Sequence, residues 1–191
     1  MDERYFQPPA PTEVDGLYFI GKLIWEKGWR EMLGMLGQTP HQVLHVFGSG
    51  DRQTVDAIQS LASTFGVTLA LQGPSATPWA DLRPFKILIN CSRSEVLCST
   101  TAEALSMGKF ALVPRHPSNE PFLRHPNCLA YDGPREFQQL LVQALASHPS
   151  PVDPRPFFDW DTATGRLLAI CQAPVGPAQL VERETPRTPT V

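Results

Sequence analysis

The sequence lacks a paired-cysteine motif. Its four cysteines are scattered over residues 91–171, without a C-x-x-C pair or a histidine at metal-ligand spacing. We therefore expect reduced thiols in a reducing compartment, and neither a disulfide framework nor a metal site. Cys98 lies close to a predicted helix start, where the pKa of a thiol can be lowered. A small apolar residue in the core is the favoured interpretation of this cysteine.

Long apolar runs and basic tracts are also missing. No run approaches the roughly 18 residues that a membrane-spanning helix needs, and the opening MDERYFQPPAPTEVDG carries acids where a targeting peptide carries bases. We expect a chain that is neither secreted nor inserted in a membrane. The formal net charge is −3, which makes nucleic acid an unexpected partner.

The length and composition are those of a globular protein with one sizeable core. The chain has 191 residues, of which 42% are hydrophobic and 18% are charged. Residues 1–15 are polar and contain three prolines, so we expect a disordered arm or linker. One domain is expected over residues 16–172, followed by a disordered, proline-rich tail over 173–191.

Short apolar runs alternate with amphipathic segments along this domain. This alternation predicts an α/β fold with a doubly wound, Rossmann-like parallel sheet of five or six strands, covered by helices on both faces. The expected strands are LYFIG (17–21), QVLHVFG (42–48), VTLALQG (67–73), KILINC (86–91), FALVPR (110–115) and a short CLAY (128–131). The expected helices cover about 29–36, 52–65, 100–107, 134–146 and 157–171, with short elements near 79–82 and after Ser118.

The stretch EVLCSTTAEALSMGK places two carboxylates, Glu95 and Glu103, eight residues apart around a predicted helix start. Thr100 suits the N-cap and Glu103 the capping-box position, while Gly108 can end the helix. Ligands of such sheets collect beyond the carboxyl ends of the strands, and free amides at a helix start suit a phosphate. Glu103 could then bind sugar hydroxyls, although a capping box alone also explains this residue.

The turn after the first predicted strand argues against the commonest nucleotide sites. It reads GKLIWEKG, which is not the G-x-G-x-x-G of a dinucleotide site, and no Walker sequence is present. Lys22 and Lys27 flank this loop, where two ammonium groups could neutralise a diphosphate and remove the need for a metal ion. Two solvated lysines beside Glu26 remain an equally good interpretation of the same letters.

Several segments together resemble a known family. GLYFIGKLIWEKGWREML, HVFGSGD, INCSRSEVLCSTTAEALSMGKFALVPRHPSNEPF and HPNCLAY are similar, in this order, to the carboxyl-terminal half of digalactosyldiacylglycerol synthases. These are retaining glycosyltransferases of family four with the GT-B fold. The resemblance extends from about Gly16 to Cys171, and the two glutamates fit the E-x7-E signature of the wider family. It implies that this chain is the donor-binding domain of such an enzyme.

The resemblance also implies roles for individual residues. It assigns catalysis to Lys22 and Lys27, which would contact the diphosphate, and to Glu95, which would face the donor hexose. Glu103 would bind the ribose, and the uracil would lie near the end of the third strand. The donor-binding residues are then Gly21, Gly48, Gly50, Gln72, Gly73, Leu97, Cys98, Ser99, Thr100 and Glu103. His116, Asn119 and Glu120 follow the fifth strand, and we favour a structural role for this loop.

The implied reaction transfers galactose from UDP-galactose to monogalactosyldiacylglycerol with retention of configuration and without a metal or other cofactor. The amino-terminal domain, which would hold the galactolipid acceptor and contact the membrane, is missing from this sequence. Activity of the chain alone is therefore in doubt. The resemblance implies a peripheral location at the outer envelope membrane of the chloroplast. Two alternatives stay open: a non-catalytic nucleotide-sugar-binding or partner module, and a glycosyltransferase half with another sugar or acceptor.

Overall fold

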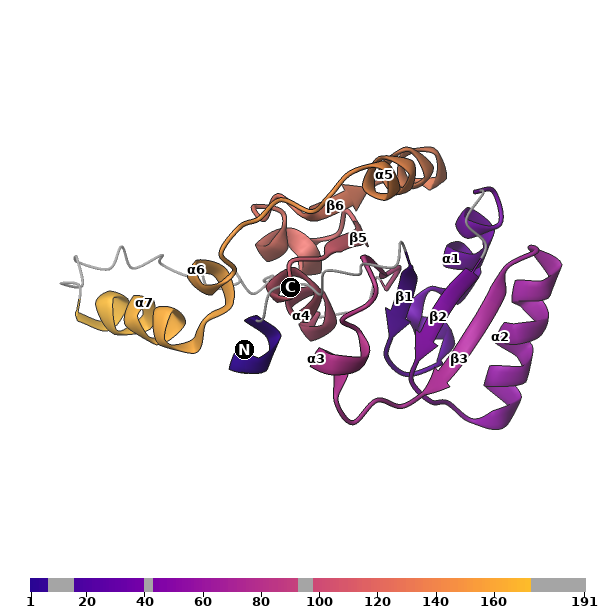
Figure 1. Cartoon of the computed structure of the whole chain (residues 1–191), viewed down its shortest axis with the longest axis horizontal. Coiled ribbons are helices and arrows are strands. Elements are labelled where there is room, and N and C mark those ends of the chain that lie inside the picture. Colours follow the sequence, from indigo (N-terminus) through magenta and orange to yellow (C-terminus); the bar gives the residue numbers. More distant parts are fainter. Residues whose placement is uncertain (7–15, 40–42, 93–97, 173–191) are drawn as a thin grey trace, which may run out of the picture.

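The computed structural model describes residues 1–6, 16–39, 43–92 and 98–172. These residues contain a six-stranded, entirely parallel sheet in the order β3-β2-β1-β4-β5-β6 (Figure 1). The strands are β1 Leu17–Ile20, β2 Val43–Phe47, β3 Thr68–Gly73, β4 Ile87–Ile89, β5 Phe110–Pro114 and β6 Cys128–Tyr131. The predicted doubly wound sheet is confirmed. The strand order reverses between β1 and β4, which makes their carboxyl ends the expected ligand-binding edge.

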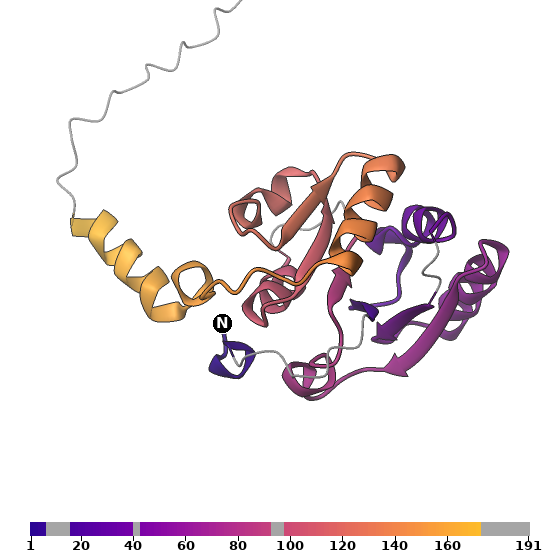
Figure 2. The same cartoon turned by 45° about the horizontal axis from the view of Figure 1, so that its top comes forward.

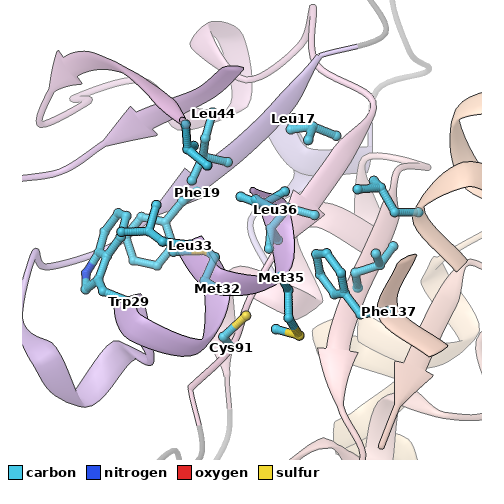
Figure 3. Close-up of a cluster of buried hydrophobic side chains, with 14 of the residues drawn as sticks. Leu17, Phe19, Trp29, Met32, Leu33, Met35, Leu36, Leu44, Cys91 and Phe137 are labelled. Atoms are coloured by element: carbon cyan, nitrogen blue, oxygen red, sulfur yellow. The ribbon is translucent and has the colours of Figure 1, made fainter. Parts of the chain in front are cut away.

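One face of the sheet is covered by α1 (Trp29–Leu36), α2 (Arg52–Thr64) and α5 (Pro134–Ala146). Apolar residues of α1 recur at helical spacing, and the side chains of Trp29, Met32, Leu33 and Leu36 are fully buried (Figure 3). They pack with Phe19 of β1, whose ring centroid lies 4.6 Å from that of Trp29. This cluster fixes α1, and with it the loop that precedes α1.

The opposite face is covered by α4 (Ser99–Ser106), which is buried over most of its length, and by the short α3 (Pro78–Asp81). Tyr18, Leu88 and Leu105 are among the buried residues of this second cluster. Lys109, between α4 and β5, is only 1% exposed, and its Nζ donates hydrogen bonds to the carbonyls of Arg83 (3.1 Å) and Phe85. A buried ammonium group therefore ties the end of α4 to the α3–β4 connection.

The amino terminus corrects one sequence-based expectation. Residues 1–6 were expected to belong to a disordered arm, but Glu3–Phe6 form a 3₁₀ helix, η1. Tyr5 is buried beside α4 and packs edge-on against Trp79, and the Arg4 guanidinium lies 3.5 Å from the centroid of the Trp79 ring. The prediction failed because the burial of Tyr5 depends on tertiary neighbours that the polar composition of the segment does not reveal. Residues 7–15 and 173–191 lie outside the described residues.

The carboxyl-terminal helix predicted near 157–171 is divided in two, α6 (Arg155–Phe158) and α7 (Trp160–Gln172). The break lies at Asp159, whose carboxylate accepts hydrogen bonds from the amide (2.9 Å) and hydroxyl (3.0 Å) of Thr162 and so begins a new helix. Figures 1 and 2 show α7 extending away from the sheet. Within the part of the chain that the structure describes, no helix combines the length and apolarity needed to cross a membrane.

Candidate functional site

A pocket of about 340 Å³ lies where the strand order reverses. Its walls come from β1 and the loop after it, from the end of β4 and from the start of α4. Six residues that the sequence had singled out line it together: Gly21, Lys22, Lys27, Cys98, Ser99 and Thr100. The pocket also includes Asn90 at the end of β4. Two lysines and the start of a helix thus meet at one cavity, as the diphosphate hypothesis requires.

The loop that carries the lysines is held on two sides. Its amides at Gly21 and Leu23 donate hydrogen bonds of 2.9 Å to the carbonyls of Phe47 and Ser49, which belong to β2 and the loop after it. On the other side, Gly28 has φ of +76°, and a Cβ at this position would lie 2.5 Å from the Cys91 carbonyl oxygen. Lys22 is exposed and Lys27 is partly buried. The backbone of the loop is therefore fixed, and both lysines line the pocket.

Gly48 and Gly50 have close neighbours within the protein itself. A Cβ at Gly48 would lie 1.8 Å from the carbonyl oxygen of Gly21, and one at Gly50 would lie 2.5 Å from that of Leu23. Their missing side chains let the loop after β2 pack directly on the loop after β1. Contact of these glycines with a donor stays a prediction.

The start of α4 differs from the predicted start at Thr100. The helix begins at Ser99 with Cys98 as its N-cap, and no side chain makes a cap hydrogen bond there. Glu103 consequently lies in the second turn, so the predicted capping box is wrong. Cys98 takes the N-cap position because its buried thiol packs into the second apolar cluster, which anchors the chain five residues ahead of Glu103. The capping explanation of Glu103 is thereby removed.

Glu103 of α4 is not among the residues that line the pocket. The residue is partly buried, and this burial raises the pKa of its carboxyl group. Burial, followed by the negative charge of Glu103, also raises the pKa of Tyr5 to about 12 and that of Tyr18 still further. The charge of this acid therefore acts on the tyrosines of η1 and β1. A ribose contact by Glu103 stays a prediction.

The remaining donor-binding candidates are not brought to the pocket lining. Gln72 is exposed at the end of β3, with its Nε2 3.4 Å from Nδ1 of His45. Gly73 accepts a 2.8 Å hydrogen bond from the Gly48 amide, so the third strand end is joined to the second. Glu95 and Leu97 lie outside the described residues.

The loop after β5 is organised by its own side chains, in agreement with the structural role that we favoured. Nδ1 of His116 accepts a hydrogen bond from the Ser118 amide at 3.3 Å, and Nδ2 of Asn119 donates to the Pro114 carbonyl at 2.9 Å. These contacts shape the 3₁₀ helix η3 (Pro117–Phe122), and Glu120 is exposed.

Asn90 is a polar lining residue that the sequence-based analysis did not single out. It is buried, with 5% of its surface exposed, and follows the last residue of β4. Its Oδ1 accepts a hydrogen bond from the Ser92 amide, and its Nδ2 donates to Cys98 Sγ at 3.1 Å. The available signal was a polar residue at the end of an otherwise apolar strand.

Within the described residues, no group of three or more histidine, cysteine, aspartate or glutamate side chains is arranged to hold a metal ion. The charged residues that line the pocket are Lys22 and Lys27. The arrangement is suited to an anionic ligand.

No protein-family model matches the chain. It is 39% identical over 159 residues to digalactosyldiacylglycerol synthase 1, chloroplastic, of Lotus japonicus, which covers 80% of this chain and 20% of that protein. The chain is similar to digalactosyldiacylglycerol synthases. Digalactosyldiacylglycerol synthase 2, chloroplastic, of Glycine max is 39% identical over 161 residues, which are 80% of this chain and 34% of that protein. Digalactosyldiacylglycerol synthase 2, chloroplastic, of Arabidopsis thaliana is 32% identical over 81% of this chain and 34% of that protein. The chain thus spans about a fifth to a third of these relatives.

Solved structures agree on the fold. Anabaena Alr3699/HepE in complex with UDP and glucose superposes with a TM-score of 0.71 over 91% of this chain and 55% of that one, at 14% identity. The lipopolysaccharide outer core galactosyltransferase WaaB, in its apo form, superposes with a TM-score of 0.63 over 86% of this chain and 51% of that one, at 17% identity. The described domain has the Rossmann-like fold of a GT-B glycosyltransferase domain, and the resemblance to digalactosyldiacylglycerol synthases is confirmed.

Proposed function

We propose that this chain is the donor-binding half of a retaining galactosyltransferase and that it binds UDP-galactose. The observation that carries the proposal is the pocket in which Lys22 and Lys27 meet the start of α4. Its position between β1 and β4 is where α/β sheets bind nucleotides. The names of the relatives supply the sugar and the lipid, which the pocket alone does not specify.

In this proposal the diphosphate lies between the lysine ammonium groups and the amides at the start of α4. Helix amides in the first turn have no partner inside the helix and point toward an anion, and α4 has no capping side chain that would compete. The ammonium groups neutralise the charge that develops on UDP as it leaves. Lysines and helix together do the work that a metal ion does elsewhere, so no metal or other cofactor belongs to the proposal.

The pocket volume of about 340 Å³ is at the low end for small-molecule sites, of roughly 300–1,000 Å³. The pocket can hold the diphosphate, and the nucleoside and the hexose of the donor would then contact residues outside the pocket. We assign the ribose to Glu103, the uracil to the region of Gln72 and Gly73, and the hexose to Glu95. The glycine loops after β1 and β2 would lie against the donor.

The acceptor belongs to the part of the relatives that this chain does not span. We propose that an amino-terminal domain supplies the site for monogalactosyldiacylglycerol and the peripheral contact with the membrane. Galactose then passes to the lipid with its anomeric configuration retained. The location that follows from the relatives is the chloroplast, and we propose the outer envelope membrane.

Isothermal titration calorimetry with UDP, UDP-galactose and UDP-glucose tests the donor site. We expect binding of all three at micromolar to millimolar concentration and a raised melting temperature, because a ligand that binds only the folded state stabilises it. Absence of any heat or melting shift with 5 mM UDP would contradict the proposal. Adding an amino-terminal half in trans and assaying transfer of radiolabelled galactose to monogalactosyldiacylglycerol then tests the activity itself.

A further inference from the structure

Asn90 makes hydrogen bonds to both sides of the connection between β4 and α4. On the strand side, its Oδ1 accepts from the amide of Ser92 at 3.0 Å. On the helix side, its Nδ2 donates to Cys98 Sγ at 3.1 Å and to Thr101 Oγ1 at 3.4 Å. One buried amide therefore joins the last residues before the 93–97 segment to the first turn of the helix after it.

The backbone of Asn90 is held just as firmly as its side chain. Its amide donates to the Leu112 carbonyl of β5 at 3.0 Å, and its carbonyl accepts from the Tyr131 hydroxyl of β6 at 3.4 Å. Residue 90 is thus anchored to two neighbouring strands while its side chain reaches the helix. Since the residue also lines the lysine pocket, the anchor and the candidate site share one wall.

We propose that Asn90 is a positioning residue that sets the direction of the α4 amides toward the diphosphate. This inference rests on the proposed function. Helix amides bind a phosphate well only when they are held within about half an ångström of the productive geometry by a surrounding hydrogen-bonded shell. The start of α4 has no side-chain cap, so the bonds from Asn90 to Cys98 and Thr101 supply that shell.

Asparagine has the chemistry that this position demands. Its carbonyl oxygen accepts from the Ser92 amide while its NH₂ group donates two hydrogen bonds toward the helix. An ionised aspartate keeps the acceptor, has no donor, and adds a negative charge beside the anion. Alanine removes both the acceptor and the donor and leaves the buried hydroxyl of Thr101 without this partner.

The test compares three forms of the whole chain, the wild type, Asn90→Ala and Asn127→Ala. Asn127 is the matched control because it is fully buried at the opposite edge of the sheet, where its amide also makes two hydrogen bonds, both to Ser150. Calorimetry measures UDP affinity, and ³¹P NMR of bound UDP reports the environment of the phosphates. Amide hydrogen exchange over residues 98–101 reports the helix start without any ligand.

We expect Asn90→Ala to weaken UDP binding at least tenfold, to shift the ³¹P resonance of the bound β-phosphate toward its free position, and to speed exchange at 98–101. Asn127→Ala should lower the melting temperature comparably and leave UDP affinity within twofold. Equal losses in both variants, or an unchanged ³¹P spectrum in Asn90→Ala, would overturn the inference. If the wild type fails to bind UDP, the proposed function is overturned instead. In that case, unchanged amide hydrogen exchange at 98–101 in Asn90→Ala also overturns the role of Asn90 in holding the start of α4.

Discussion

Gly48 and Gly21 are in such close contact that a Cβ on residue 48 would lie 1.8 Å from the carbonyl oxygen of residue 21. The two glycines follow β2 and β1, neighbouring strands of the sheet. Their contact brings the loop after β2 onto the loop that carries Lys22. The position of that lysine therefore depends on a residue more than twenty positions away that has no side chain.

The variant Gly48→Ala should be strongly destabilised. Both the added methyl group and the φ of +156° require the backbone to shift, so we expect a loss of about 3 kcal/mol or more in the free energy of unfolding. Chemical denaturation checks this. Gly165→Ala is the control, because residue 165 is inside α7 with open space around its Cα, and a gain of roughly 0.5–1 kcal/mol is expected. Similar stability of the two variants would show that the loops do not pack as described.

The double variant Lys22→Ala/Lys27→Ala should bind UDP about 10- to 100-fold more weakly. Hydrogen bonds to charged groups contribute roughly 1.5–3 kcal/mol, and about 1.4 kcal/mol corresponds to a factor of ten. Affinity of the wild type should also fall with added salt more steeply than that of the variant. Calorimetry at two ionic strengths measures both effects. Arg52→Ala removes a charge with a 95% exposed side chain on α2 and should leave affinity unchanged.

Glu103→Gln should raise stability at neutral pH while weakening UDP binding. Burial raises the carboxyl pKa of Glu103 above its ordinary 4.5. At pH values between the ordinary and the raised pKa, the folded protein therefore binds more protons than the unfolded chain. The stability of the wild type therefore falls as pH rises through this window, whereas neutral glutamine avoids that loss. Melting temperatures from pH 4 to pH 8 should show the variant gaining only above the window. A gain confined to acid pH, or unchanged UDP affinity, would contradict this account.

Tyr5→Ala should lower the free energy of unfolding by about 1–3 kcal/mol. Tyr5 is 8% exposed and packs against Trp79 beside α4, so its removal exposes apolar surface and lets η1 detach. Water should then reach Glu103, and the pKa of this acid should fall toward its ordinary value. Thermal melting and NMR titration of the Glu103 side chain measure the two effects. Glu3→Ala, an exposed residue of the same 3₁₀ helix, should change neither.

The helices and strands were predicted well where local pattern decides them. Pro134 at the first position of α5 and the apolar spacing of α1 gave the observed bounds of both helices. The start of α4 was misplaced because Cys98, which carries no capping signal, is fixed there by burial and by Asn90. The order of Tyr5 and its helix η1 was missed for a related reason, because its partner Trp79 is more than seventy residues away in the sequence.

The sequence by itself determined the alternation of strands and helices, the lysines of the first loop and the presence of an acid on the helix that follows β4, because these follow from the order of residue types within short segments. The tertiary structure alone decided that β4 lies beside β1, and hence that Lys22, Lys27 and Thr100 share a pocket. It also decided that Asn90 anchors the helix start and that Lys109 is buried. Strand order and burial depend on which segments pack together, and residue periodicity carries no record of those neighbours.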